Sequence, residues 1–77
     1  MTKTIVTVLG YDQRGIIAKV STLLYECGAN ILDINQTIMQ EYFSMVMLVD
    51  VSPCTVSFHD LKESLAKLGE ELELSIL

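Results

Sequence analysis

Apolar residues recur along this chain with two different spacings, one typical of strands and one typical of helices. Residues 3–9 predict a strand in the middle of a sheet, because from Thr4 to Leu9 every residue is β-branched or apolar and both faces are apolar. From about Arg14 to Cys27 the apolar positions follow a helical period, and Gly28 stands where a left-handed residue commonly ends a helix. The first third of the chain therefore predicts a strand followed by a helix.

The middle of the chain predicts two further strands. Residues 31–40 alternate, with Leu32, Ile34 and Ile38 on one face and polar side chains on the other, which indicates a strand with one wet face or an edge strand. A short turn is expected at residues 41–42. Residues 43–51 are almost continuously apolar, so we expect a central strand that is covered on both sides.

The last third predicts a second helix and a final strand. Ser57 and Asp60 have the spacing of a capping box, with Ser57 as the N-cap. A helical apolar stripe follows and is expected to end at Gly69. The alternation over residues 72–77, closed by Leu77, predicts a strand with one apolar face.

This order of elements predicts an α+β fold. Two interlocked crossover units of this kind form a ferredoxin-like βαββαβ sandwich, a four-stranded antiparallel sheet with two helices on one face. The third strand then lies beside the first, and the second and fourth strands form the edges. Residues 1–77 are expected to be a single domain whose second sheet face needs another cover.

Composition narrows the choice of partners. A chain of 77 residues that is 51% hydrophobic has more apolar side chains than one small core hides, which favours a homo-oligomer. The net charge of −5 and the five scattered basic residues argue against binding to nucleic acid or to an anionic membrane surface. The N-terminus does not resemble a signal peptide and no apolar run is long enough to span a membrane, so a cytoplasmic protein is expected.

The turn between the first strand and the first helix is the candidate binding element. Backbone amides at a helix start have no partner within the helix, and the helix dipole favours an anion there. Asp12 is a candidate either to bind a ligand's ammonium group or to cap the helix. Arg14, in the expected first turn, opposes the dipole unless an anion is close, and otherwise is a solvated surface residue. Gly15 allows either a close ligand or tight helix–sheet packing.

Other reactive side chains point to ordinary structural roles. Cys27 is expected to be a buried apolar residue and Cys54 an exposed thiol, and their spacing with His59 fits no metal site. His59 is expected to be solvated. The methionines at positions 39, 45 and 47 are expected in the sheet core. Without a catalytic constellation or a cofactor motif, the sequence predicts a protein that is not an enzyme and needs no cofactor.

Several motifs together resemble the ACT domain, a module of metabolic regulation. These motifs are the turn at residues 10–18, the helix exit at 27–31 and the strand pair from 34–37 through 42–45. The resemblance is to small stand-alone bacterial ACT proteins and covers the chain. It implies a homodimer that binds an amino acid or similar metabolite near the interface, through the turn after the first strand and the start of the second strand.

From the turn and the resemblance together, the predicted ligand-binding residues are Gly10, Asp12, Arg14, Gly15, Ile16, Asn30 and Ile31. Many relatives have proline where this chain has Arg14, which makes the turn less rigid. The predicted function is a non-catalytic regulatory module for a small-molecule effector. The alternative is a protein-interaction subunit that docks on an enzyme or regulator through its sheet face or an edge strand.

Overall fold

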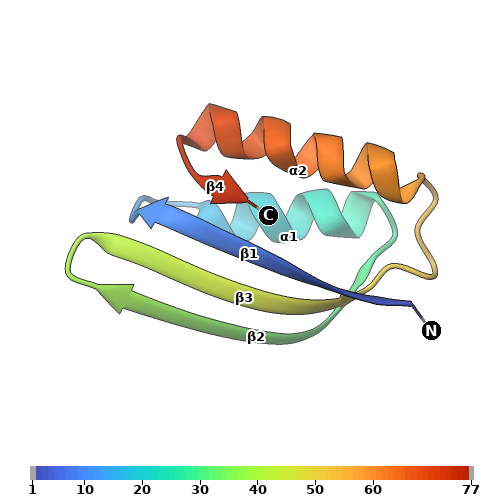
Figure 1. Ribbon diagram of the computed structural model, residues 1–77, viewed down its shortest axis with the longest axis horizontal. Helices are drawn as coiled ribbons and strands as arrows, with labels where there is room; N and C mark the ends of the chain where they lie inside the picture. Colours follow the sequence, from blue (N-terminus) through green and yellow to red (C-terminus); the bar gives the residue numbers. More distant parts are fainter. Residues whose placement is uncertain (1, 77) are drawn as a thin grey trace.

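A computed structural model describes residues 2–76, and Met1 and Leu77, which the sequence places at the N-terminus and in the final strand, lie outside the described residues. The elements follow the predicted order (Figure 1). They are β1 (Lys3–Tyr11), α1 (Ile16–Glu26), β2 (Asn30–Met39), β3 (Tyr42–Asp50), α2 (Phe58–Leu72) and β4 (Ser75–Ile76). The ferredoxin-like α+β prediction is confirmed.

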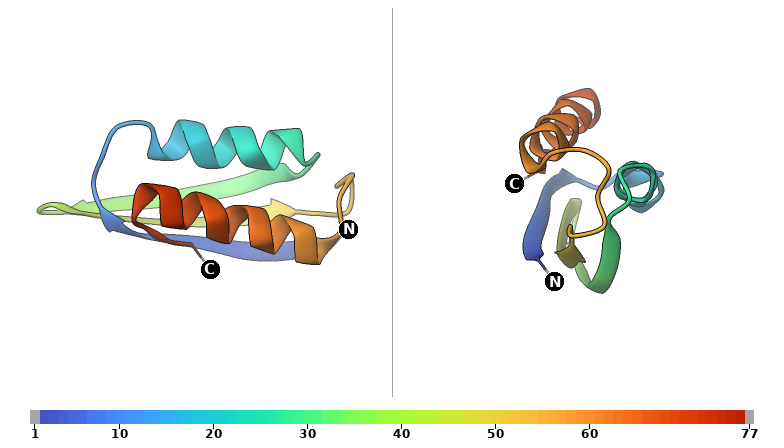
Figure 2. Two further views of the ribbon diagram at one scale, coloured as in Figure 1. Left: turned by 90° about the horizontal axis from the view of Figure 1, so that it is seen from above. Right: turned by 90° about the vertical axis from the view of Figure 1, so that its right-hand side faces the viewer.

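The four strands form one antiparallel sheet in the order β2-β3-β1-β4. As predicted, β3 lies beside β1, and β2 and β4 form the edges. Both helices cover the same face of this sheet (Figure 2). Among the described residues, β4 pairs with β1 through Ile76 with Val8 and through Ser75 with Leu9.

Strand alternation divides the sheet into a covered face and an open face. In β3 the side chains of Phe43, Met45, Met47 and Val49 point under the helices and are buried. The side chains between them belong to the open face, and Val46 is 42% exposed. The prediction that β3 is covered on both sides is therefore wrong for one protomer, because both crossovers place their helices on the same side.

The hydrophobic core lies between the helices and the covered face. Val8 and Met45 from the sheet meet Val20 and Leu24 from α1 and Leu61 from α2, and all five are buried. Met45 and Met47 lie in the core as predicted. Met39 does not: it ends β2 on the open face and is 70% exposed.

Both helix C-termini are closed by a residue in the left-handed region. Gly28, with φ 87°, follows α1, and the Ala29 N–H donates to the Leu24 carbonyl, which confirms the predicted stop. The predicted stop of α2 at Gly69 is wrong, because the helix runs on to Leu72 and ends at Glu73 with φ 56°. A Cβ at Gly69 would lie 2.8 Å from the Leu74 carbonyl oxygen, so glycine is needed there for close packing.

The final strand, expected over residues 72–77, begins only at Ser75, because Leu72 still belongs to α2. The other predicted boundaries shift by one to two residues. β1 continues through Gly10 to Tyr11, and α1 begins at Ile16. β2 and β3 each begin one residue earlier than expected, and the turn between them falls on Gln40 and Glu41, where Gln40 has φ 57°. Leu32 is the extra residue of a bulge in β2, so the simple alternation expected there is interrupted.

Candidate functional site

A hollow opens between the start of α1 and the C-terminal half of β2, and we call it the turn hollow. Its volume is about 320 Å³, at the lower end of the range for small-molecule sites. It is lined by Asp12, Gln13, Gly15, Ile16, Ile17, Ala18, Gln36, Ile38 and Phe43. It is therefore built mainly by the turn that the sequence singled out.

The turn is tied to the body of the protein on both sides. The Asp12 backbone N–H donates to the Glu41 carbonyl at 2.8 Å, which joins the turn to the β2–β3 hairpin. The Gln13 side-chain amide donates to the Leu72 carbonyl at 2.7 Å, at the end of α2. These two hydrogen bonds fix the wall of the hollow before any ligand arrives.

Gly15 is the N-cap of α1. Its φ of 83° lies in the left-handed region, which glycine adopts without the strain that other residues incur. Over residues 2–76 no side chain caps this helix, so the prediction that Asp12 is the N-cap is wrong. The Asp12 carboxylate is thus not engaged in capping.

The first turn of α1 presents unpaired backbone donors to the hollow. The first bond of the helix runs from the Lys19 N–H to the Gly15 carbonyl at 2.9 Å, which leaves the amides of Ile16, Ile17 and Ala18 without a carbonyl partner in the helix. The first turn carries no acidic side chain. The positive end of the helix dipole therefore faces the hollow without a compensating charge from its own turn.

The predicted residues of the turn do not all lie at the hollow. Asp12, Gly15 and Ile16 line the turn hollow. Arg14 is exposed, precedes the helix instead of lying in its first turn, and does not line the hollow. Gly10 lies inside β1 opposite Phe43, where the Leu74 side chain packs against it, so its glycine is explained by packing.

The two predicted residues of the second strand lie at the other end of the sheet. Asn30 pairs with Asp50 at the end of β3. The turn begins after Tyr11, which pairs with Tyr42 at the start of β3. Eight strand residues separate these levels, about 25 Å. Asn30 and Ile31 line a different hollow of about 380 Å³ beside the C-terminal half of α1, which we call the strand hollow.

Gln36 and Ile38 line the turn hollow although the sequence reading did not select them. Gln36 pairs with buried Met45, so it lies on the covered side of β2 between two isoleucines at positions 34 and 38. A lone polar residue at an inward position of a strand is the signal that identifies it. Gln13 was also missed, because only the fold brings it to the end of α2.

The remaining candidates have structural roles. Cys27 and Cys54 are free thiols that are both partly buried against the core, so the prediction of an exposed Cys54 is wrong.

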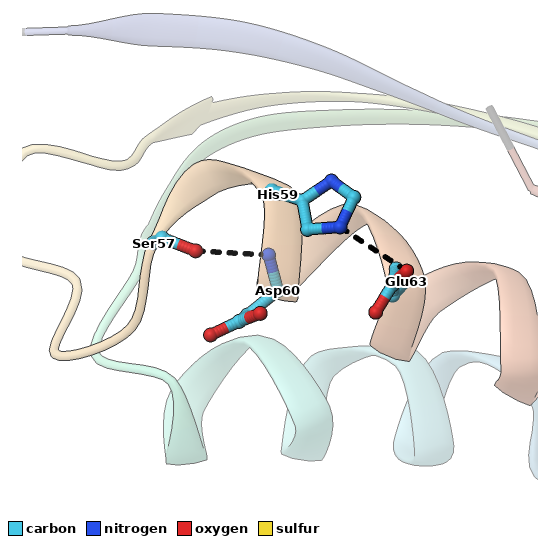
Figure 3. Close-up of polar contacts among 4 residues, drawn as sticks. All are labelled: Ser57, His59, Asp60 and Glu63. Carbon is cyan, nitrogen blue, oxygen red and sulfur yellow. Dashed lines mark hydrogen bonds and ion pairs between the residues drawn. The ribbon is translucent and has the colours of Figure 1, made fainter.

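His59 is exposed, as predicted, and its Nε2 lies 3.2 Å from Oε1 of Glu63 on the surface of α2 (Figure 3). The same figure shows the Asp60 N–H donating to the Ser57 hydroxyl, which confirms the predicted cap. Within residues 2–76, no three His, Cys, Asp or Glu side chains gather in a way that would hold a metal ion.

Comparison with known proteins identifies the family. The ACT domain family model matches residues 2–77. The chain belongs to the ACT domain family. It is 49% identical over 77 residues to a UPF0237 protein of Methanocaldococcus jannaschii, covering all of this chain and 86% of that protein. It is 55% identical over 74 residues to a UPF0237 protein of Clostridium acetobutylicum, covering 96% of this chain and 83% of that one.

A solved structure supports the same assignment. The ACT domain protein from Streptococcus pneumoniae superposes with a TM-score of 0.83 at 40% identity, over 96% of this chain and 83% of that one. ACT domains are typically regulatory domains that bind ligands. In the described part of this ACT domain, neither helix has the length and apolar character needed to cross a membrane.

Proposed function

We propose that this ACT domain is a non-catalytic, cytoplasmic regulatory module that binds an amino acid at the interface of a homodimer. The observation that carries the proposal is the turn hollow, where free amides at the start of α1 lie beside the Asp12 carboxylate. An amino acid carries a carboxylate and an ammonium group close together. The amides suit the first and Asp12 suits the second, while Ile38 and Phe43 offer an apolar wall for a side chain.

The outer edge of β2 supports a partner at this site. β2 is an edge strand of ten residues, a length that proteins usually protect from further pairing. Its inward-facing Ile34 and Ile38 remain 41% and 57% exposed, because α1 does not cover them. A second copy that adds its own β2 to this edge would hide both side chains.

Symmetry then explains why two distant groups of residues belong to one site. If two β2 strands pair antiparallel around a two-fold axis near residues 34–35, the start of one strand lies beside the end of the other. Asn30 of the partner subunit then lies next to Met39 and close to the turn hollow. The turn hollow of one protomer and the strand hollow of its partner would form one composite site.

Regulation follows if the ligand contacts both subunits. A ligand shifts an equilibrium only by its differential affinity for the two states. An amino acid held by Asp12 and Gly15 of one protomer and by the partner's Asn30 would bind the dimer more tightly than the monomer. Ligand concentration would then set the fraction of dimer.

Calorimetric titration of the protein with each of the twenty amino acids at millimolar concentration tests the proposal. At least one is expected to bind. Asn30→Ala removes a hydrogen bond to a charged group, which is worth about 1.5–3 kcal/mol, so the affinity should fall about tenfold or more. Gly15→Val forces a branched residue into the left-handed region and should also weaken binding.

Ser64→Ala is the matched control, because it also truncates an exposed polar side chain but lies on α2, outside both hollows and away from the β2 edge. It should leave the affinity unchanged. Both site variants should lose ligand-promoted dimerisation together with binding. No heat from any of the twenty amino acids, or a site variant that loses binding while its dimerisation still responds fully to ligand, would contradict the proposal.

A further inference from the structure

The two cysteines of the chain, both free thiols, lie where the end of α1 contacts the loop before α2. Cys27 is the C-cap residue of α1, and Cys54 belongs to the loop between β3 and α2. The Thr55 N–H donates to the Cys27 carbonyl at 2.9 Å, which joins the two segments directly beside both cysteines. Neither thiol lines the turn hollow or the strand hollow, so the proposed amino-acid site leaves the pair unexplained.

The hydrogen bond between Thr55 and Cys27 limits the distance between the two cysteine Cα atoms. With standard bond lengths and the near-linear geometry that N–H···O bonds prefer, the Cys27 carbonyl oxygen lies about 4.3 Å from the Cα of Cys54 and about 2.4 Å from its own Cα. The two Cα atoms are therefore at most about 6.7 Å apart. Disulfides join cysteines whose Cα atoms are about 4.4–6.8 Å apart. The backbone thus holds this pair at a separation that a disulfide can bridge.

The two side chains also face the same region of the protein. Both are partly buried, and both pack against the hydrophobic core. A Cβ at Gly28 would lie 3.4 Å from the Cα of Cys54, so the loop rests directly on the end of α1. Burial raises the pKa of the Cys54 thiol, and the neighbouring Cys27 thiol and Asp50 carboxylate raise it further. Two residues that are distant in the sequence are therefore neighbours in the fold.

We propose that Cys27 and Cys54 are a redox-sensitive pair that closes to an intramolecular disulfide by exchange with a small disulfide such as oxidised glutathione. The Cys27 thiolate attacks one sulfur of the small disulfide, whose S–S bond breaks, and the released thiolate takes up the proton that Cys27 lost. The Cys54 thiolate then attacks Sγ of Cys27 in the mixed disulfide, and the second small thiol leaves with the proton of Cys54. Two protein thiols are oxidised and one small disulfide is reduced to two thiols.

Burial sets the order of the two attacks. A thiol whose pKa is raised carries little thiolate at neutral pH, so Cys54 is a poor nucleophile toward a reagent in solution. In the second step the fold holds its target beside it, and this proximity compensates for the small thiolate fraction. The new bond would tie the exit of α1, three residues before Asn30 and the strand hollow, to the loop that leads into α2.

The equilibrium between dithiol and disulfide in glutathione buffers tests the proposal. Folded wild-type protein is brought to equilibrium from the fully reduced and from the fully oxidised form, quenched with acid, and its free thiols are counted by alkylation and mass spectrometry. The same measurement in urea gives the value for the unfolded chain, in which nothing holds the pair together. The disulfide should form on the order of 100-fold more favourably in the folded protein, as the usual stabilisation by a native disulfide requires.

The matched control is Cys54→Ser/His59→Cys, which moves the second thiol onto the exposed surface of α2. The loop between the two thiols grows by only five residues, so in urea this variant should form its disulfide almost as readily as the wild type. In the folded state it should show no gain. Circular dichroism checks that the variant is folded, and the comparison of folded with unfolded wild type needs no variant.

Three results would overturn the proposal. The folded wild type could form the disulfide no more favourably than the chain in urea. It could instead keep glutathione as a stable mixed disulfide or link to a second chain. The folded control could gain as much as the wild type, which would show that the position of Cys54 is not what matters. Amino-acid binding is measured on the reduced protein, so failure of either proposal leaves the other standing.

Discussion

Replacing Gly28 by alanine should destabilise the protein far more than the same replacement of Gly15, although both glycines have nearly the same backbone conformation. Their φ angles are 87° and 83°. The left-handed region costs an alanine about 1–2 kcal/mol at either position. The difference arises from what the new Cβ would meet.

At Gly15 the nearest atom to a new Cβ is Cε of Lys19 at 3.8 Å, an ordinary contact with a flexible side chain. At Gly28 the nearest atom is the Pro53 carbonyl oxygen at 2.9 Å. That loop is fixed, because the Thr55 N–H donates to the Cys27 carbonyl at 2.9 Å. Forcing the loop away costs a further ~1–3 kcal/mol, typical of overpacking.

Gly15→Ala should therefore lower the free energy of unfolding by about 1 kcal/mol and Gly28→Ala by about 3 kcal/mol. Urea unfolding at one protein concentration measures both, since self-association would otherwise change the result. In a thermal scan Gly15→Ala should lower Tm by about 5 °C and Gly28→Ala by on the order of 15 °C. Equal losses for the two variants would refute the argument that close approach of the 53–55 loop is what requires glycine at position 28.

Three further predictions follow from single contacts. The hydroxyl and the backbone N–H of Ser52, both donating to Asp50, hold the pKa of that carboxyl below its usual value, so the stability that they confer is present above about pH 4 and is lost as the pH falls through the lowered pKa. In Asp50→Asn, the free energy of unfolding measured at a series of pH values should therefore depend less on pH below about pH 4. Burial raises the pKa of the Cys54 thiol, so iodoacetamide at pH 8 should alkylate it more slowly than free cysteine, with unfolding abolishing the difference. Ser57→Ala removes the cap of α2 and should cost about 1 kcal/mol in urea unfolding, whereas an unchanged midpoint would contradict the cap's role.

The fold followed from local patterns because each element carries its own period. The apolar positions of α1 and α2 and the apolar run of β3 depend only on neighbouring residues, so the sequence predicted their order and pairing correctly. The ends of helices were harder to predict at glycine, because a glycine can either end a helix or allow another segment to pack closely against it. Gly28 ends a helix with a positive φ, while Gly69 lies within a helix where Leu74 passes close by.

The residues of the turn hollow were less predictable, because their positions depend on backbone angles and on the register of the strands. The turn at Asp12 and Gly15 was found from its position between a strand and a helix. That Gly15 and not Asp12 caps α1 depends on a backbone angle. Gln36 reaches the hollow through the pairing of β2 with β3, and the separation of Asn30 from the turn is set by the length of those strands.

Subunit complementation tests most directly the claim that one site is shared by two chains. Asp12→Ala and Asn30→Ala damage opposite halves of the proposed site. The two variants are unfolded together, refolded as a one-to-one mixture and titrated with an amino acid that binds the wild type. Half of the dimers should be mixed, and each mixed dimer should hold one intact site and one doubly damaged site. The account predicts recovery of about one quarter of the wild-type sites at wild-type affinity. A mixture that binds no better than its two parents would contradict it.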